Sequence, residues 1–364
     1  MRAATRLSPR TILLLALSPM ALACGGVTSA VSSDDAGVDA PTGETAHEDA
    51  PSGDMAEGRI VEACAAVAKA TCNKRVSCSG KIDATGVGIV RQFGTMAECL
   101  TRQALQCLNA FRAPGSGHSL ATEQECVAAF ASYSCPDFFA DSVPPPCQPA
   151  GSRVNGAACA FNAQCKSTFC TGEKNAVCGT CGPSPAVGAS CVDSDCALGQ
   201  VCDATTMTCK LLGVAGDPCD SGDDCGYALI CGAATGTTGS RKCESTLSEL
   251  GAACGGSMPV CDGTQGLFCA GAAGAKKCVA TTFVGDGMPC GVLSQDAFAG
   301  CEAGACYTAN GIAAAGEMGA CKASASDGAA CDTILGPGCE LPARCILSGK
   351  GTAGICRVPT GNCL

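Results

Sequence analysis

Cysteine recurs along the C-terminal part of this chain in sets of four, and a glycine stands three residues before the first cysteine of each set. Repetition at this interval indicates a series of small units rather than one large domain. The opening glycines are Gly156, Gly188, Gly216, Gly251, Gly287 and Gly328. The expected sets are Cys159, Cys165, Cys170 and Cys178; Cys191, Cys196, Cys202 and Cys209; Cys219, Cys225, Cys231 and Cys243; Cys254, Cys261, Cys269 and Cys278; Cys290, Cys301, Cys306 and Cys321; and Cys331, Cys339, Cys345 and Cys356, which leaves Cys181 and Cys363 over.

A repeat of about 30 residues cannot bury enough apolar surface to offset the entropy of ordering its chain. Closing a loop of about 15 residues with a disulfide contributes roughly 3 kcal/mol, so two bridges rival the whole core of such a unit. The chain has 35 cysteines and no tryptophan, which fits this account. We therefore expect structural disulfides that pair locally, although four cysteines allow three pairings. Turn-forming residues between the cysteines predict small β-ribbons. The opening glycine either supplies a positive φ or allows two backbones to approach closely.

The first 23 residues have the order of an export signal. Arg2, Arg6 and Arg10 precede the apolar residues 11–17, and small residues then lead to Cys24. The apolar run is too short to span a membrane. The segment resembles a bacterial lipoprotein signal, and the resemblance implies that the thiol of Cys24 is acylated and anchors the chain. Cleavage by ordinary signal peptidase, which would give a freely secreted protein, is the alternative.

Residues 24–58 are expected to form an acidic, disordered tether. Between residues 25 and 57 there are eight acidic side chains but no cysteine, aromatic residue, lysine or arginine. The formal net charge of the whole chain is −10. Nucleic acid is therefore not an expected partner, and contact with a membrane is expected through the N-terminal lipid only.

Residues 59–147 are expected to form a small helical unit stapled by disulfides. One helix is predicted over residues 59–73, and Thr95 and Thr122 are each followed three residues later by glutamate, as in a capping box. His118 is expected to lie in a solvated loop, and Pro144 to begin a stiff, extended connector. The cysteines of this unit are Cys64, Cys72, Cys78, Cys99, Cys107, Cys126, Cys135 and Cys147.

Residues 217–231 and 159–181 resemble parts of the Dickkopf-type N-terminal cysteine-rich module, because their cysteines have similar spacings. Over its whole length the chain is more similar to predicted cysteine-rich bacterial lipoproteins that are exported. These resemblances imply an exported, disulfide-rich architecture. They carry no receptor or activity over to this chain.

Residues for catalysis or metal binding are scarce. The chain has two histidines, and Cys178 and Cys181 form its one Cys-x-x-Cys sequence, for which a redox pair or half a zinc site is the alternative to structural disulfides. Four aspartates between residues 217 and 224 could bind calcium, but acidic surface turns are commoner. We expect no cofactor and no metal site.

The sequence thus predicts a small disulfide-rich protein: a signal peptide at residues 1–23, a tether at 24–58, a helical unit at 59–147 and six short four-cysteine repeats at 148–364. We expect a monomeric, non-enzymatic protein in the cell envelope or on its outer surface, or otherwise secreted. Its expected role is a structural module or one that binds an extracellular protein or glycan. A secreted protease inhibitor is the alternative, with residues 232–242 and 307–320 as inhibitory loops.

Overall fold

A computed structural model describes most of the chain after residue 52. The described residues are 53–82, 85–140, 143–172, 176–191, 196–197, 199–203, 205–220, 224–232, 241–255, 260–314, 317–349 and 351–363. The predicted signal peptide, Cys24 and nearly all of the predicted tether lie outside these residues.

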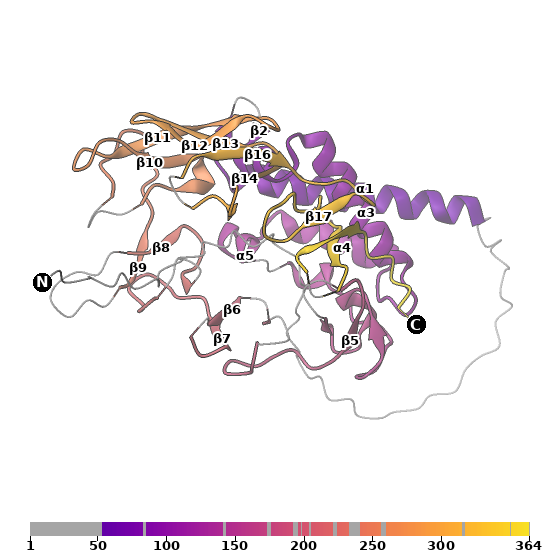
Figure 1. The fold of residues 1–364 in the computed structure, drawn as a ribbon. Coiled ribbons are helices and arrows are strands. Elements are labelled where there is room, and N and C mark those ends of the chain that lie inside the picture. The colour runs from indigo at the N-terminus through magenta and orange to yellow at the C-terminus, as the bar shows by residue number, and fades with distance from the viewer. Residues whose placement is uncertain are drawn as a thin grey trace, which may run out of the picture.

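The N-terminal part is a helical unit whose longest helices are stapled together (Figure 1). Its elements are α1 (Gly53–Ser77), β1 (Lys81–Ile82), β2 (Thr85–Gly86), α2 (Val87–Phe93), α3 (Met96–Arg112), α4 (Leu120–Phe130), α5 (Cys135–Phe139) and η1 (Pro145–Cys147). Disulfides join Cys64 to Cys107 and Cys72 to Cys99, so α1 and α3 run antiparallel with a bond about every two turns. Two further bonds, Cys78–Cys135 and Cys126–Cys147, fasten α5 to the end of α1 and η1 to α4.

The helices differ from the sequence prediction at three places. Helix α1 begins at Gly53, so residues 53–58, expected in the tether, are helical. Thr95 caps α3 as predicted, but α4 begins earlier than expected, because Ser119 is its N-cap and exchanges capping hydrogen bonds with Thr122. The residues after Pro144 form the short 3₁₀ helix η1 rather than an extended connector, since Cys147 is held against α4.

The remaining chain forms six small repeats, each built on a short β-ribbon. Their elements are β3 (Ala158–Cys159), η2 (Asn162–Gln164), β4 (Cys170–Thr171) and β5 (Gly179–Cys181) in the first; β6 (Gln200–Asp203) and β7 (Thr208–Leu211) in the second; β8 (Leu229–Cys231) and β9 (Cys243–Ser245) in the third; η4 (Gly263–Gln265), β10 (Leu267–Ala270) and β11 (Lys277–Val284) in the fourth; β12 (Pro289–Ser294), β13 (Ala297–Cys301), β14 (Gly304–Thr308), β15 (Gly311–Ile312) and β16 (Gly319–Ala323) in the fifth; and β17 (Ala330–Asp332), β18 (Arg344–Leu347) and β19 (Ala353–Arg357) in the sixth. The expected disulfide-rich architecture of a helical unit followed by stapled ribbons is confirmed.

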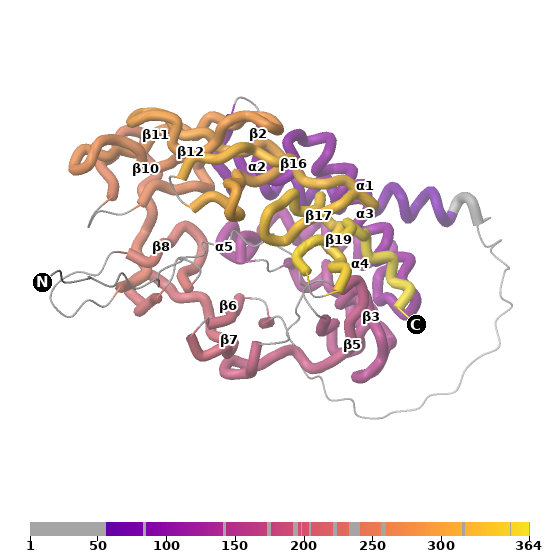
Figure 2. The backbone as a smooth tube through the Cα atoms, viewed as in Figure 1, coloured from indigo at the N-terminus to yellow at the C-terminus, as the bar shows by residue number. Residues whose placement is uncertain are grey.

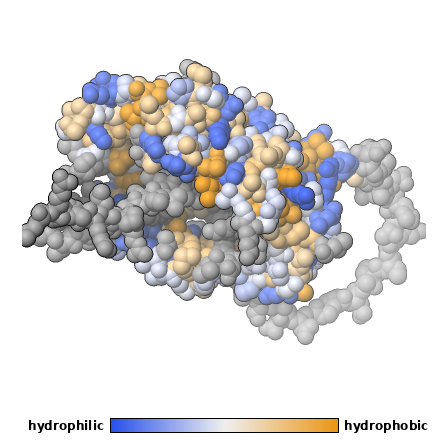
Figure 3. All heavy atoms as spheres, in the orientation of Figure 1, coloured by the Kyte–Doolittle hydropathy of each residue, from blue (hydrophilic) through white to orange (hydrophobic). Residues whose placement is uncertain are grey.

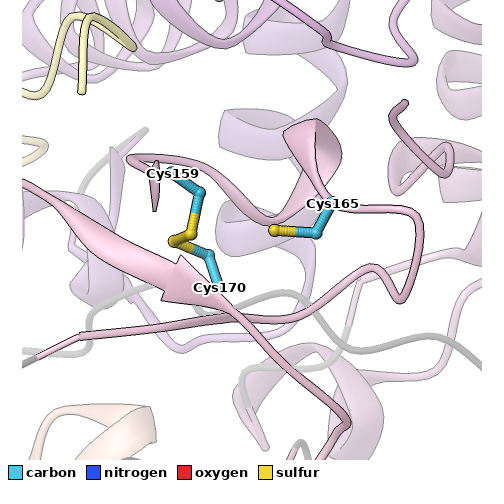
Figure 4. Close-up of side chains that lie close together, drawn as sticks. All are labelled: Cys159, Cys165 and Cys170. Atoms are coloured by element: carbon cyan, nitrogen blue, oxygen red, sulfur yellow. A yellow bond between two sulfur atoms is a disulfide. The ribbon is translucent and has the colours of Figure 1, made fainter. Parts of the chain in front are cut away.

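One pattern of disulfides is common to all six repeats: the first cysteine bonds the third, and the second bonds the fourth, with Cys181 as the fourth cysteine of the first repeat. Figure 4 shows the first of these bonds, Cys159–Cys170, with Cys165 beside it. In every ribbon the third and fourth cysteines lie directly opposite one another, as Cys202 and Cys209 do. Directly paired residues project to the same face of a ribbon. Each can therefore bond one cysteine from the first half of its repeat.

The opening glycine has the same conformation in each repeat. All six have a positive φ, between 73° and 94°, and a Cβ at any of them would meet no atom within 4 Å. The conformation, and not close approach of another backbone, therefore requires glycine here. Gly216, for example, is the third residue of a turn closed by a 3.0 Å bond from the Asp217 N–H to the Val214 carbonyl, and its own N–H donates to the Cys243 carbonyl at 2.8 Å.

The repeats curve around the helical unit instead of extending away from it as a rod (Figures 1 and 2). In the third repeat the Tyr227 ring stacks on Phe139, with centroids 4.9 Å apart, and its hydroxyl donates to the Cys78 carbonyl at 2.8 Å. In the fourth, the Thr264 carbonyl accepts a bond from the Gly80 N–H at 2.9 Å. The fourth and fifth repeats share one seven-stranded sheet, in which β11 pairs with β13 in parallel.

The sixth repeat returns to the start of the array. Its Asp327 accepts two hydrogen bonds, 2.8 and 2.7 Å long, from Arg102 on α3. Beyond β19, the chain is tied to the first repeat by the disulfide Cys178–Cys363, which spans 185 residues of sequence. The bond therefore closes a covalent loop of residues 178–363, which holds the second to sixth repeats and curves around the helical unit.

Candidate interaction surface

The cysteines expected to be structural are all bonded, but one of them in an unexpected way. Cys178 was expected to complete the first set, whereas Cys181 bonds Cys165 and Cys178 bonds Cys363. The reason is strand register: Cys181, not Cys178, lies opposite Cys170 in the first ribbon. The others of the predicted list, Cys159, Cys165, Cys170, Cys191, Cys196, Cys202, Cys209, Cys219, Cys225, Cys231 and Cys243, bond within their own repeats.

Sulfur atoms gather closely enough in the repeats to imitate metal sites. In the first repeat those of Cys159, Cys165 and Cys170 lie within 4.8 Å of one another (Figure 4). Each is bonded in a disulfide, whereas a metal ligand must be a thiolate. The Cys-x-x-Cys sequence is likewise two halves of separate disulfides. These clusters are the crossing bridges of each repeat.

Two of the aspartates considered for calcium, Asp217 and Asp224, accept hydrogen bonds from backbone amides within the repeat. Asp217 accepts from the Val214 N–H at 2.9 Å, and Asp224 accepts from the Asp220 N–H at 2.6 Å. Asp224 also pairs with Lys210 at 3.0 Å, which joins the second and third repeats. Asp223 lies outside the described residues. The carboxylates of Asp217 and Asp224 are thus engaged by backbone amides and a lysine.

His118 is not the solvated loop residue that the sequence suggested. Its Nδ1 pairs with the Glu123 carboxylate, and the two side chains are 10% and 3% exposed. The imidazole also lies beside the Phe111 ring, with the centroids 6.4 Å apart and the planes inclined by 25°. Glu123 was missed as a partner because it lies five residues on, across the beginning of α4. The His118–Glu123 pair thus connects the beginning of α4 to α3, where Phe111 lies.

Exposed apolar side chains recur at the opening turns of the repeats. In five repeats one of the four turn residues is a large aliphatic side chain that is 53–70% exposed. These apolar turn residues are Val154, Val187, Val214, Leu250 and Met288. On the face seen in Figure 3, apolar residues form separate patches rather than one continuous area.

The opening turn of the sixth repeat carries Asp327 in place of an apolar residue, and this is the turn that binds Arg102. A turn of the same geometry therefore already serves as a docking element within this molecule. The sequence contained the signal for the apolar turn residues, since each lies within two positions of an opening glycine. The partner of Asp327 had no such signal.

A shallow hollow lies at the first of these turns. It is open to solvent, has a volume of about 490 Å³ and is lined by Val154, Asn155, Lys166 and Ser167. It combines an aliphatic side chain with a lysine and polar groups. Such a rim suits the edge of a protein contact.

The loops between the third and fourth cysteines vary more than the ribbons that hold them. They range from residues 203–208 in the second repeat to residues 307–320 in the fifth. Residues 307–320, considered as an inhibitory loop, include the short hairpin of β14 and β15 and lead into β16. Residues 233–240 of the other considered loop lie outside the described residues. A common scaffold thus holds segments of different length.

Comparisons with protein-family models, with curated proteins and with solved structures found no match to this chain. The likenesses to Dickkopf-type modules and to bacterial lipoproteins therefore stay predictions from the sequence. What the chain itself shows is heavy disulfide bonding, since every cysteine from Cys64 to Cys363 is bonded. Such bonding indicates an oxidising, extracytoplasmic setting. Among the described helices, none is long and apolar enough to cross a membrane.

Proposed function

We propose that this chain is an exported, non-enzymatic interaction protein whose opening turns contact another extracellular protein. The observation that supports this most is the recurrence of exposed aliphatic side chains at equivalent turns of five repeats, while the sixth turn docks on α3. Single exposed apolar residues are ordinary, but here one recurs in the same turn of five repeats, at the first, second or fourth place of the turn. Aliphatic side chains form no hydrogen bonds with sugar hydroxyls, which favours a protein over a glycan.

The closed loop of repeats suits this role because it limits the freedom of the turns before binding. A surface that is already ordered loses less conformational entropy on association. Several turns on one rigid scaffold also allow one partner, or several copies of it, to be contacted at once, which raises avidity. Loops of different length would add specificity.

A substitution experiment tests the apolar turn residues. We expect the variant Val154→Ser/Val214→Ser/Leu250→Ser to lose at least tenfold in capture of a partner from a cell-surface protein fraction, since losing even one well-buried contact costs about 1.4 kcal/mol. The matched control, Leu211→Ser/Met318→Ser/Ile355→Ser, removes three exposed aliphatic side chains outside the turns and should bind as the wild type does. The measurement is quantitative cross-linking with each variant as bait.

Three outcomes would contradict the proposal: equal capture by the two variants, loss of capture only in the control, or no partner captured by the wild type. The alternative of a protease inhibitor is separated by adding the wild type to a panel of serine and cysteine proteases. A protease slowed by the wild type and by the turn variant alike would favour inhibition through a loop.

Anchoring through Cys24 is also part of the proposal, on the basis of the sequence before it. Acylation at that residue would place the tether between the membrane and the helical unit. The intact mass of protein purified from its own cells is expected to show a chain that begins at Cys24 and carries added fatty acyl mass. A mass without acyl groups would leave a secreted protein.

A further inference from the structure

The disulfide Cys178–Cys363 differs from the other described disulfides in two respects. Its sequence separation of 185 residues far exceeds the others, which lie between 11 and 57. Cys178 is also exposed, whereas every other cysteine in the described part of the chain is buried or partly buried. A reagent in solution therefore meets Cys178 before any other described cysteine.

The surroundings of this bond favour attack by a thiolate. A hollow of about 160 Å³ beside it is lined by both cysteines, Arg357 and Asn362. Two further arginines reach the same place: Arg153 donates to the Cys363 carbonyl at 3.3 Å, and Arg344 donates to the Ala176 carbonyl at 3.0 Å. Positive charge near a cysteine stabilises its thiolate, which is both the attacking and the leaving form in thiol–disulfide exchange.

The bond also fixes residues 358–363, the segment that follows β19. After β19 the chain contacts the first repeat through the Gly361 carbonyl, which accepts from Gln164 at 3.1 Å. Cys363 then ends the described chain, with its sulfur 3.8 Å from the Val177 carbonyl. Breaking the bond leaves hydrogen bonds and the packing of Val358 on the core of the sixth repeat to hold this segment. We refer to residues 358–363 as the C-terminal strap.

We propose that Cys178–Cys363 is a thiol-exchange site, through which a dithiol reductant opens the loop of repeats. A thiolate of the reductant attacks Sγ of Cys178 and forms a mixed disulfide, while the bond to Cys363 breaks and its electron pair leaves on Cys363 Sγ. The second thiolate of the reductant then attacks the reductant sulfur that is bonded to Cys178. A disulfide forms within the reductant, and the Cys178 thiolate leaves. The two cysteines take up the two protons that the reductant lost. The chain gains two electrons, and the dithiol becomes a disulfide.

Opening at this site does not depend on which partner the repeats bind. The bridges within the repeats have at most one partly buried cysteine each and no exposed one, so they resist exchange for longer. The helical unit keeps its own four bonds. The expected product is an open chain in which each repeat remains folded and the C-terminal strap is free.

Limited reduction of the full chain with dithiothreitol, without denaturant, tests the proposal. At successive times thiols are blocked with N-ethylmaleimide and located by peptide mass spectrometry. We expect Cys178 and Cys363 to be labelled together and at least tenfold faster than any other pair. Prior or simultaneous labelling of another pair would overturn the assignment.

Two sets of variants keep the test specific. Cys178→Ser/Cys363→Ser should lack the fast phase, and Cys191→Ser/Cys202→Ser should retain it. Arg357→Gln should slow the fast phase several-fold, whereas Arg357→Lys should preserve it; equal rates in these two would overturn the role given to the positive charge. Amide exchange after the fast phase should rise in residues 358–363 and stay unchanged in the ribbons, and unchanged exchange in the strap would show that the bond does not control opening.

Discussion

The double substitution Cys225→Ala/Cys243→Ala is expected to unfold the third repeat while the helical unit stays folded. The buried cluster of this repeat consists of its four cysteines, with Leu229 the one other hydrophobic residue packed against it. The lost bond closes 18 residues and is worth about 3 kcal/mol through the unfolded state alone. The four sulfur atoms also form most of the core. Removing two of them should therefore cost more free energy than the stability of the repeat.

Hydrogen exchange measured by mass spectrometry checks this expectation. Amides of β8 and β9 should lose their protection in the variant, and those of α3 should keep theirs. A matched control is Cys126→Ala/Cys147→Ala, whose bond closes a similar 21 residues in the helical unit. There Phe130 and Phe138 pack edge to face at 6.4 Å within an aromatic cluster, so α4 should remain protected. Retained protection in β8 and β9 would contradict the account.

The substitution Arg102→Met is expected to detach the sixth repeat from α3 and to destabilise the chain by about 2–3 kcal/mol. The Arg102 side chain is 8% exposed, grips Asp327 through both terminal nitrogens and donates to the carbonyls of Leu341 and Glu340. Burial by itself would lower the pKa of Arg102, but the hydrogen bond and charge of Asp327 and the charge of Glu340 raise it. Removal leaves these acceptors without their donor. The estimate is at the lower end for a buried pair because Asp327 is 39% exposed.

Arg102→Lys is the control for charge without geometry. A lysine keeps the positive charge but cannot form the two parallel bonds to Asp327, so an intermediate loss is expected. Denaturant unfolding and amide exchange in β17 and β18 measure both variants. Since the bond Cys178–Cys363 also holds the sixth repeat, the loss should be larger when Cys178 and Cys363 are serine. Equal stability of wild type and Arg102→Met would contradict this docking contact.

The repeats could be predicted from the sequence because their determinants are local. Each repeat needs a glycine in a tight turn and two disulfides within some 30 residues. These requirements appear in the sequence as a regular spacing of glycine and cysteine. The pairing within a set could not be read, because it depends on which cysteines the ribbon register places opposite one another. The spacings of Cys178 and Cys181 fit the fourth place of the first set equally well. The sequence therefore could not show that Cys181, and not Cys178, completes the first repeat.

The closing of the loop could not be predicted, because its determinants are far apart in the sequence. Cys178 and Cys363 were each visible as cysteines, but nothing in their neighbours marks them as a pair. The residues around Arg102 in α3 give no indication that its partner is Asp327 in the sixth repeat. Such pairings are set by how whole units pack, which local residue patterns do not encode.

Peptide mapping of the unreduced protein, digested at low pH to prevent exchange, tests most directly whether disulfides set this architecture. The account predicts linked peptides in which each repeat joins first to third and second to fourth cysteine, together with a peptide that links Cys178 to Cys363. Free thiols in the repeats, or a bond between Cys165 and Cys178 that leaves Cys181 with another partner, would contradict it.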